Sequence, residues 1–403
     1  GQGAAPGTIL VGYNYLVSQD INNFLEAHGR DEDNNTTKST TVDVFNMSYG
    51  GAYRPNLRYQ YYTWEETFSL GTSTLRDGKG AIYVKSSGNG YDTQPDSTCG
   101  IGKTLSCTET SIDRVNQSPH IINVAAMNAD GVKSSYSTPG SSIWVSGFGG
   151  EYGTNSAIYS DDVEWAEERL DPAIMTVDRS SCLLGSSRGV DGENYAGSNT
   201  FNLGGYASDN ITLNPSCNYH SQFNGTSAAA PTVSGVIALI LEANSDLTWR
   251  DVKHILVTTS DKVDGTRVAE FGGVVQYRWV ENTAGYEHHN WYGFGRVNAA
   301  AAVSAAKTYT ANSLGSYITS DLYQGLTGGT IPDNSGGLVT QEITKPTGSN
   351  GIVEFVRVII NLDHSEPWSV GLRLESPGGT VINLMQPGTN IRNPAGAFYF
   401  DIG

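Results

Sequence analysis

A single hydroxyl, that of Ser227, lies in the segment GTSAAAP among residues with little or no side chain. Its neighbours Gly225, Ala228 and Ala229 leave room for another backbone, and the apolar run that follows predicts a helix that begins here. The start of a helix offers free N–H groups and a dipole that stabilises developing negative charge. Such a serine is either a helix cap or a nucleophile, and a nucleophile needs a neutral imidazole as base, itself oriented by a carboxylate.

Two other segments end predicted strands in small and polar residues. These residues are Ser48, Tyr49 and Gly50 in VFNMSYGG, and Ser86, Ser87, Gly88 and Asn89 in KSSGNGY. Each segment alone is equally explained by a strand that ends in a turn or a hairpin. In open parallel sheets, however, chemistry gathers beyond the carboxyl ends of the strands, so we expect both segments to approach Ser227.

The elements that position these residues are short apolar runs rich in β-branched residues. Runs that are apolar almost throughout predict strands buried on both faces, and hence a parallel sheet covered by helices. The predicted strands are TILVGYNYL (8–16), VDVFNMS (42–48), AIYVKSS (81–87), IINVAAM (121–127), IWVSGF (143–148) and AIMTVD (173–178).

Helices are predicted between and after these strands. Residues 18–29 have Ser18 as a cap and Gly29 as a stop, and a second helix is expected over 63–78. Later helices are expected after Ser227, where the sequence is apolar on nearly all sides, and over 247–260 and 294–307.

The sequence changes character from Lys307 onward. Gly, Thr, Ser and Asn become frequent, which indicates a linker. VEFVRVIINLDH, WSVGLRLESPGGTVINLM and AFYFDIG then alternate apolar residues between turn signals, which predicts an antiparallel β module. Three or four strands would leave an open edge and an incomplete core.

The charge of the chain excludes some partners. Forty-one acidic and 24 basic side chains give a net charge of −17, which repels phosphate backbones and anionic lipid heads. We therefore expect no nucleic acid and no membrane as partner. Charged residues are only 16% of the chain while small polar residues are plentiful, a composition common in secreted or periplasmic proteins.

The cysteines indicate an oxidising compartment. Cys99, Cys107, Cys182 and Cys217 contain no CxxC pair, which favours disulfides over a zinc site. Three connectivities are open, and we favour Cys99 with Cys107 and Cys182 with Cys217 because each pair closes a local loop. Any of the three implies secretion or export.

The three segments in this order resemble the subtilisin superfamily of serine peptidases. The nucleophile of that superfamily lies in a GTS-small-A-small-P motif, matched here by GTSAAAP, and an oxyanion-hole amide comes from a strand-end Gly-Asn, matched by Gly88 and Asn89. Residues 238–260 and 291–303 are similar to the kexin and proprotein-convertase branch. IPDNS (331–335) and LRLESPGGT (372–380) resemble the P domain of that branch.

The resemblance implies a domain organisation and a set of roles. It predicts a peptidase domain over 1–308, a linker over 309–325 and a partial β jelly roll, the P domain, over 326–403. Ser227 would be the nucleophile and Asn89 the oxyanion donor. Residues Ser48 to Gly50 would pair with an extended substrate, and Ser86 to Gly88 would line the first pocket.

The resemblance also implies protein or peptide substrates, a propeptide or chaperone as partner, and a structural calcium ion. Kexin-like selectivity for basic residues needs acidic side chains in the first pockets, and MSYGGAYRPN lacks the usual acidic pair. Asp96 is the best match to an acid near the first pocket, although a residue of a loop turn explains it equally. No EF-hand spacing is present.

The Asp and His of the triad should precede Asn89 in this superfamily. The one histidine there, His28 in LEAHGRDED, is expected to be solvated at the end of an exposed helix. We expect His120, His220, His254, His288 and His289 to be structural or exposed.

The opening GQGAAPGTILVGYNYL resembles the family segment that follows the helix of the catalytic histidine. We therefore expect a fragment, which alone would be inactive.

Two other functions are considered. A non-catalytic relative that serves as a binding or scaffold protein has no physical need for both Ser227 and Asn89. A carbohydrate-binding or adhesive role of the β module would require exposed aromatic residues. We expect those present to be core residues: Trp368, Phe398, Tyr399 and Phe400.

Overall fold

The computed structural model describes most of the chain. The described residues are 3–30, 38–50, 58–91, 105–153, 171–180, 184–187, 214–320, 329–331, 339–340, 342, 352–362, 364, 366, 369–389 and 398–402.

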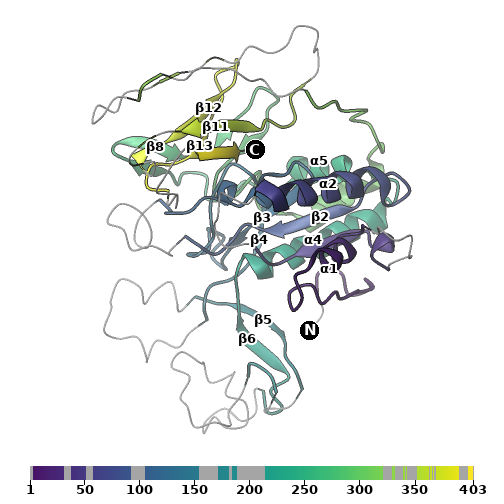
Figure 1. Ribbon diagram of the computed structural model, residues 1–403. Helices are drawn as coiled ribbons and strands as arrows, with labels where there is room; N and C mark the ends of the chain where they lie inside the picture. Colours follow the sequence, from purple (N-terminus) through teal and green to yellow (C-terminus); the bar gives the residue numbers. More distant parts are fainter. Residues whose placement is uncertain are drawn as a thin grey trace, which may run out of the picture.

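A four-stranded parallel sheet forms the centre of the molecule, as predicted (Figure 1). Its strands pair in chain order and are β1 (Val44–Met47), β2 (Ile82–Ser86), β3 (Ile121–Met127) and β4 (Ile143–Phe148). Every residue of β2 and β3 is buried, in line with their apolar character, from which Lys85, Ser86 and Asn123 depart.

Helices cover both faces of this sheet (Figure 1). On one face, α4 (Thr226–Ala243) packs Val233 and Ile237 against Val84 and its neighbours. On the other face, α2 (Arg58–Thr74) contributes the buried side chain of Phe68, and Leu75 follows directly after the helix in the same core. Because side chains alternate along a strand, neighbouring residues of β2 face different helices.

Two further helices pack near α4. Helix α5 (Trp249–Thr259) begins with a capping box between Thr248 and Asp251, and α6 (Ala299–Thr308) begins at Asn298. Both confirm predicted helices. Helix α6 starts later than the expected residue 294, because Arg296 forms isolated β-bridges with Ser146 and Asp261 instead of entering the helix.

The first helices have different bounds from those predicted. Helix α1 (Ile21–Ala27) is capped by Asp20, whose carboxylate accepts from the Asn23 backbone, while Ser18 donates its hydroxyl to that carboxylate. Helix α2 begins five residues before the predicted start at 63 and ends at Thr74. An aspartate accepts a capping hydrogen bond at least as well as a serine, so the sequence could not decide whether Ser18 or Asp20 caps α1.

The strand predicted over residues 8–16 is wrong. This segment is irregular, and Ile9 and Leu10 are 89% and 91% exposed. A strand needs a hydrogen-bonding partner, and none of the described strands pairs with this segment. Its apolar character therefore does not produce a strand here.

The predicted strand over 173–178 is present but lies outside the parallel sheet. Strand β5 (Ile174–Val177) pairs antiparallel with β6 (Tyr219–Phe223), and the hairpin projects from the sheet just before α4 (Figure 1). Exposure alternates along β5, so the expectation of a strand covered on both faces is wrong here. The remaining short elements are η1 (Lys38–Thr41), η2 (Thr110–Ile112), η3 (Arg114–Gln117), β7 (Ala269–Phe271), β8 (Val274–Tyr277), β9 (Val280–Glu281) and β10 (Glu287–His288).

The C-terminal part contains two antiparallel strand pairs, as the alternating pattern predicts. Strand β11 (Val358–Leu362) pairs with β14 (Phe398–Ile402), and β12 (Leu372–Glu375) pairs with β13 (Val381–Met385). A small core around Leu384 holds the second pair. Trp368 lies outside the described residues, so its predicted core position stays a prediction. The partial jelly roll of a P domain and the domain boundaries at 308 and 326 also stay predictions.

Helix α4 is the one described helix with the length and hydropathy of a membrane span. It packs on all four strands of the central sheet, and half of it is buried in the protein. Its hydropathy is therefore that of a core helix.

Candidate active site

Ser227 occupies the first turn of α4, two residues after a glycine whose position requires the absence of a side chain. Gly225 is the N-cap and has a φ of 108°, a conformation that favours glycine. A Cβ atom placed on it would lie 3.0 Å from Asn89 Nδ2 and 3.5 Å from the backbone nitrogen of Ser227. Asn89 Nδ2 and the Ser227 backbone nitrogen therefore lie close to each other beside Gly225.

Asn89 is held in this position through its side-chain oxygen. Its Oδ1 accepts hydrogen bonds from the backbone N–H and the hydroxyl of Thr226, both at 2.8 Å. The Thr226 Oγ1 in turn accepts from the Gly88 backbone N–H at 3.1 Å. Because Oδ1 is fixed, Nδ2 of this exposed side chain is held beside Gly225.

A proline shapes the backbone around Ser227. Pro231 lies four residues further along α4 and has no N–H, so the Ser227 carbonyl lacks its helical donor. The Ser48 hydroxyl donates to that carbonyl at 2.9 Å, and the Ser227 hydroxyl donates to the Ser48 carbonyl at 3.3 Å. The end of β1 and the start of α4 are therefore joined at the predicted nucleophile.

A cavity of about 300 Å³ opens beside Ser227, and we call it the first pocket. The predicted substrate-binding residues gather around it. Those that line it are Tyr49, Gly50, Ser86, Ser87 and Gly88, together with Asn89 and Ser227. Ser48 contacts Ser227 directly, and Asp96 lies outside the described residues.

The pocket also contains residues that the sequence reasoning missed. They are Lys85, Glu109, Thr110, Asp113 and Asn116. A signal for Lys85 was present, because a lysine inside an apolar strand buried on both faces requires a partner in the interior. Asp113 caps the short helix η3 before β3 and Asn116 lies within it, and one turn of helix leaves no periodicity in the sequence that would mark them.

The Ser227 hydroxyl has no histidine as partner in this structure. All seven histidines of the chain lie within the described residues, and none of them hydrogen-bonds to Ser227. His120 bonds to Thr72, His254 to two tyrosines, and His288 to the Ile143 carbonyl. These contacts fit the structural roles predicted for them.

The prediction that His28 is solvated is wrong. The imidazole is only 1% exposed. One of its nitrogens is hydrogen-bonded to the Phe24 carbonyl and the other to the Tyr49 hydroxyl. Rings of Phe24, Trp64 and Phe68 surround it. Burial lowers the pKa of His28 to about 4, so the ring is neutral at pH 7. The polar sequence after residue 28 concealed this packing between α1 and α2.

Two expectations concern residues that the structure describes only in part. Neither Cys107 nor Cys217 is a free thiol, while Cys99 and Cys182 lie outside the described residues, so the pairing stays a prediction. Within the described ranges no three His, Cys, Asp or Glu side chains form a metal-binding group. The calcium ion therefore stays a prediction, with no ligand assigned among the described residues.

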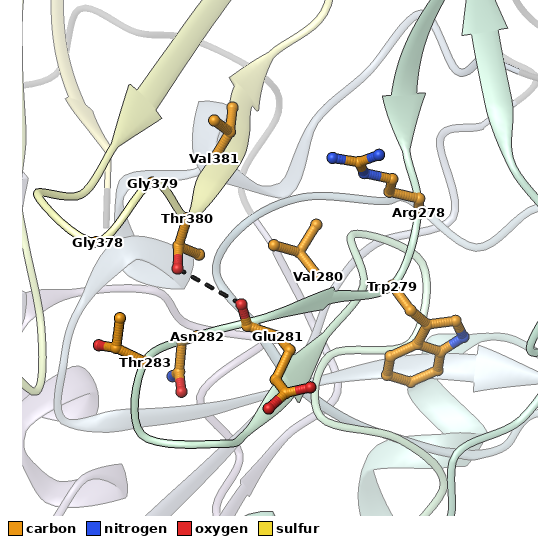
Figure 2. Close-up of a pocket in the computed structure, with 10 residues that line it drawn as sticks. All are labelled: Arg278, Trp279, Val280, Glu281, Asn282, Thr283, Gly378, Gly379, Thr380 and Val381. Carbon is orange, nitrogen blue, oxygen red and sulfur yellow. Dashed lines mark hydrogen bonds between the residues drawn. The ribbon is translucent and has the colours of Figure 1, made fainter.

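A second cavity, of about 380 Å³, lies away from Ser227 between residues 278–283 and the turn at 378–381 (Figure 2). Thr380 donates its hydroxyl to the Glu281 backbone carbonyl across one side of it. Its lining contains no serine, cysteine or histidine among the described residues. The candidate nucleophile Ser227 lines the first pocket instead.

Comparison with known proteins identifies the family of the chain. The profile of the subtilase family matches residues 1–295. The Aeromonas extracellular serine protease of Aeromonas sobria is 30% identical over 418 residues, which cover 96% of this chain and 60% of that protein. Proprotein convertase subtilisin/kexin type 7 of Homo sapiens is 34% identical over 178 residues, 43% of this chain and 21% of that protein. The chain thus spans about 60% of the length of the Aeromonas sobria relative.

Solved structures agree on the fold. The crystal structure of the serine protease of Aeromonas sobria has a TM-score of 0.71 at 25% identity and covers 99% of this chain and 68% of that one. The same protease in complex with its chaperone has a TM-score of 0.68 at 24% identity, with the same coverage of both chains. The predicted subtilisin-like α/β fold is confirmed. The chain belongs to the subtilase family.

Proposed function

We propose that this chain carries the nucleophile of a secreted, kexin-like serine endopeptidase that cleaves peptide bonds through an acyl-enzyme on Ser227. The observation that carries the proposal is that Asn89 Nδ2 and the Ser227 backbone nitrogen lie close together beside Gly225, at the start of α4. The serine protease relatives support the reaction, and the extracellular protease of Aeromonas sobria supports secretion.

The chemistry follows from these positions. The Ser227 Oγ attacks the substrate carbonyl carbon and its proton passes to a base, while the carbonyl oxygen becomes negative. Asn89 Nδ2 and the Ser227 N–H donate to that oxygen, aided by the dipole at the start of α4. The C–N bond then breaks, the leaving amine takes the proton, and water releases the acyl group.

The substrate would be an extended protein or peptide segment. Residues 48–50 follow strand β1 beside Ser227 and would pair with the substrate backbone, a recognition mode in which pockets then select side chains. A propeptide or a chaperone is proposed as a folding partner, supported by the Aeromonas sobria protease solved with its chaperone.

Two stabilising features complete the proposal. Disulfides join Cys99 with Cys107 and Cys182 with Cys217, which would appear as two peptide pairs linked only under non-reducing conditions. A structural calcium ion stays a prediction, which thermal denaturation with and without chelator would test.

We further propose that the 403-residue chain alone hydrolyses nothing. None of its histidines hydrogen-bonds to Ser227, and a serine hydroxyl without a base is a poor nucleophile at neutral pH. Activity therefore requires a base that the full-length gene product supplies.

Labelling with a fluorophosphonate tests both statements. We expect the full-length gene product to be labelled on Ser227, and neither its Ser227→Ala variant nor the 403-residue chain to react. Labelling of the chain itself would contradict the requirement for a further base. A full-length product that stays unlabelled would instead indicate a non-catalytic binding or scaffold protein.

A further inference from the structure

A buried phenol joins the end of the central sheet to the start of α4. Tyr136, between β3 and β4, is 3% exposed and does not line the first pocket. Its oxygen accepts from the Gly225 backbone N–H at 2.7 Å. Its O–H donates to the carbonyls of Gly149 and Gly150, directly after β4, at 2.8 and 2.6 Å. The phenol therefore ties the N-cap of the helix that carries the candidate nucleophile to the sheet.

Two residues further along the chain, Thr138 holds the loop that carries Asn89. Its backbone N–H donates to the Gly88 carbonyl at 3.0 Å, and its Oγ1 accepts from the Gly90 backbone N–H at 2.9 Å. Thr138 is fully buried, whereas Asn89 is exposed. Both chain neighbours of the exposed amide are thus fixed to one residue of the interior. We call residues 136–138 the bridging segment.

The bridging segment is itself anchored to the sheet. Ser137 Oγ accepts from the backbone N–H of Ala126 in β3 at 3.0 Å, and the Ser134 backbone N–H donates to the Ala126 carbonyl at 3.0 Å. The Ser134 hydroxyl donates to the Gly150 carbonyl at 2.9 Å. The segment is therefore supported by β3 and by the end of β4, independently of the two sites that it holds.

The contact between the phenol and the helix start has no spare room. A Cβ atom on Gly149 would lie 2.7 Å from the Gly225 carbonyl oxygen and 3.0 Å from the Tyr136 hydroxyl oxygen. A phenylalanine at position 136 would keep the ring and lose only that oxygen. The buried Gly225 N–H would then lack an acceptor, which is costly for a backbone group in the interior. The hydroxyl, more than the ring, therefore fixes Gly225.

We propose that Tyr136 is a positioning residue of the peptidase site: its hydroxyl fixes Gly225 and so sets the place of the Ser227 N–H relative to Asn89, which Thr138 holds from its other side. This inference rests on the proposed peptidase function. Donors to a developing oxyanion act best when they are already in place, because no rearrangement is then needed during the reaction. A misplacement of about 1 Å lowers a rate by about a hundredfold, even when its cause lies away from the reacting atoms.

Amide hydrogen exchange of the 403-residue chain, followed by NMR, tests the contacts without requiring catalysis. The Ser227 N–H has no acceptor in the part of the chain that the structure describes, while the Gly225 N–H has the phenol. We expect the protection factor of Gly225 to exceed that of Ser227 at least about tenfold. Tyr136→Phe should lower the protection of Gly225 at least about tenfold and that of Gly90 less than about threefold, and Thr138→Val should do the reverse.

Tyr292→Phe is the matched control. The Tyr292 hydroxyl is also buried, accepts from one backbone N–H, that of Lys133 at 3.1 Å, and donates to Asp264 at 2.7 Å. Neither bond reaches the two glycines, so their protection should stay within about threefold of that in the unmodified chain. Far-UV circular dichroism establishes whether each variant is folded.

Two exchange results would overturn the inference: equal protection of Gly225 and Ser227 in the unmodified chain, or unchanged protection of Gly225 in a folded Tyr136→Phe variant. The first comparison needs no variant, so a failure of Tyr136→Phe to fold does not rescue the proposal.

Kinetics of the full-length gene product distinguish positioning from a merely structural role. We expect Tyr136→Phe to lower kcat at least about tenfold with KM within about threefold, and Tyr292→Phe to leave kcat within about threefold. In an Asn89→Ala background, Tyr136→Phe should lower kcat less than about threefold, because the pair of donors whose spacing it sets no longer exists.

An equal loss of kcat in both backgrounds, or a rise of KM with kcat unchanged, would overturn the inference and leave the peptidase function intact. Absence of any hydrolysis by the unmodified gene product would overturn the peptidase function. In that case the protection of Gly225 still decides whether Tyr136 holds the start of α4.

Discussion

Ser48 and Ser227 are joined by two hydrogen bonds that run in opposite directions, each from a hydroxyl to the backbone carbonyl of the other residue. They tie the end of the first parallel strand to the first turn of the helix that crosses the sheet. The tie exists because Pro231 leaves the Ser227 carbonyl without a helical donor.

Ser48→Ala should lower the free energy of unfolding by about 1–3 kcal/mol, because a part-buried carbonyl loses its donor. Chemical denaturation measures this. Pro231→Ala offers the control, since the alanine would supply the missing N–H. In that background the cost of Ser48→Ala should fall below about 0.5 kcal/mol. An equal cost in both backgrounds would contradict the role given to the proline.

Gly225→Ala should be destabilising for two reasons. Its φ of 108° strains any residue with a side chain, and the new Cβ would lie 3.0 Å from Asn89 Nδ2. Gly131 is the matched control, because it also has a positive φ but no atom within 4 Å of the place that a Cβ would take. We expect Gly225→Ala to cost at least about 1 kcal/mol more than Gly131→Ala. An equal loss of unfolding free energy in the two variants, measured by denaturation, would show that the space beside Gly225 is not crowded.

Much of the central fold could be predicted because its signals are local. Strands β2 and β3 are apolar at nearly every position, and α5 carries its own capping box. The failure over residues 8–16 has a different cause: an apolar run forms a strand only beside a partner, and periodicity does not reveal partners.

The residues of the candidate site could be predicted where short motifs mark them, and could not where only packing brings them together. Ser227 and Asn89 were identified because GTSAAAP and SSGNG are specific in combination. Asp113 and Glu109 reach the pocket only through the tertiary structure. His28 was misplaced because its burial depends on aromatic rings of α2 that are distant in sequence.

Glu109→Gln should remove a pH dependence of stability. The folded state keeps a proton on Glu109 at pH values where the unfolded chain has lost it, because burial raises the pKa of this carboxyl. Its contribution to stability is therefore present near pH 4 and is lost as the pH rises toward the folded pKa. We expect Glu109→Gln to be more stable than the unmodified chain at pH 8 and similar to it at pH 4. Glu242→Gln, at an exposed position on α4, should show no such difference. A Glu109→Gln variant that is less stable at pH 8 would contradict the buried neutral state.

Acid should destabilise the chain well before its carboxylates are protonated. Burial lowers the pKa of His28, His120 and His288 to about 4, so between pH 6.5 and 4 these rings are charged only in the unfolded state. Stability is lost as the pH falls through this window, by up to about 1.4 kcal/mol per pH unit for each ring. Urea denaturation at several pH values measures the slope, and His28→Phe should reduce it. An unchanged slope in that variant would contradict the burial of His28.

The most direct test of the account is the turnover of the full-length gene product with Asn89→Ala. The side-chain amide should stabilise only the negative oxygen of the transition state, so kcat should fall by roughly a few hundredfold while KM stays within about threefold. That magnitude is the one measured for the corresponding amide in another subtilase. A kcat within about threefold of the unmodified enzyme would contradict the assignment of Asn89 and Ser227 to one catalytic site.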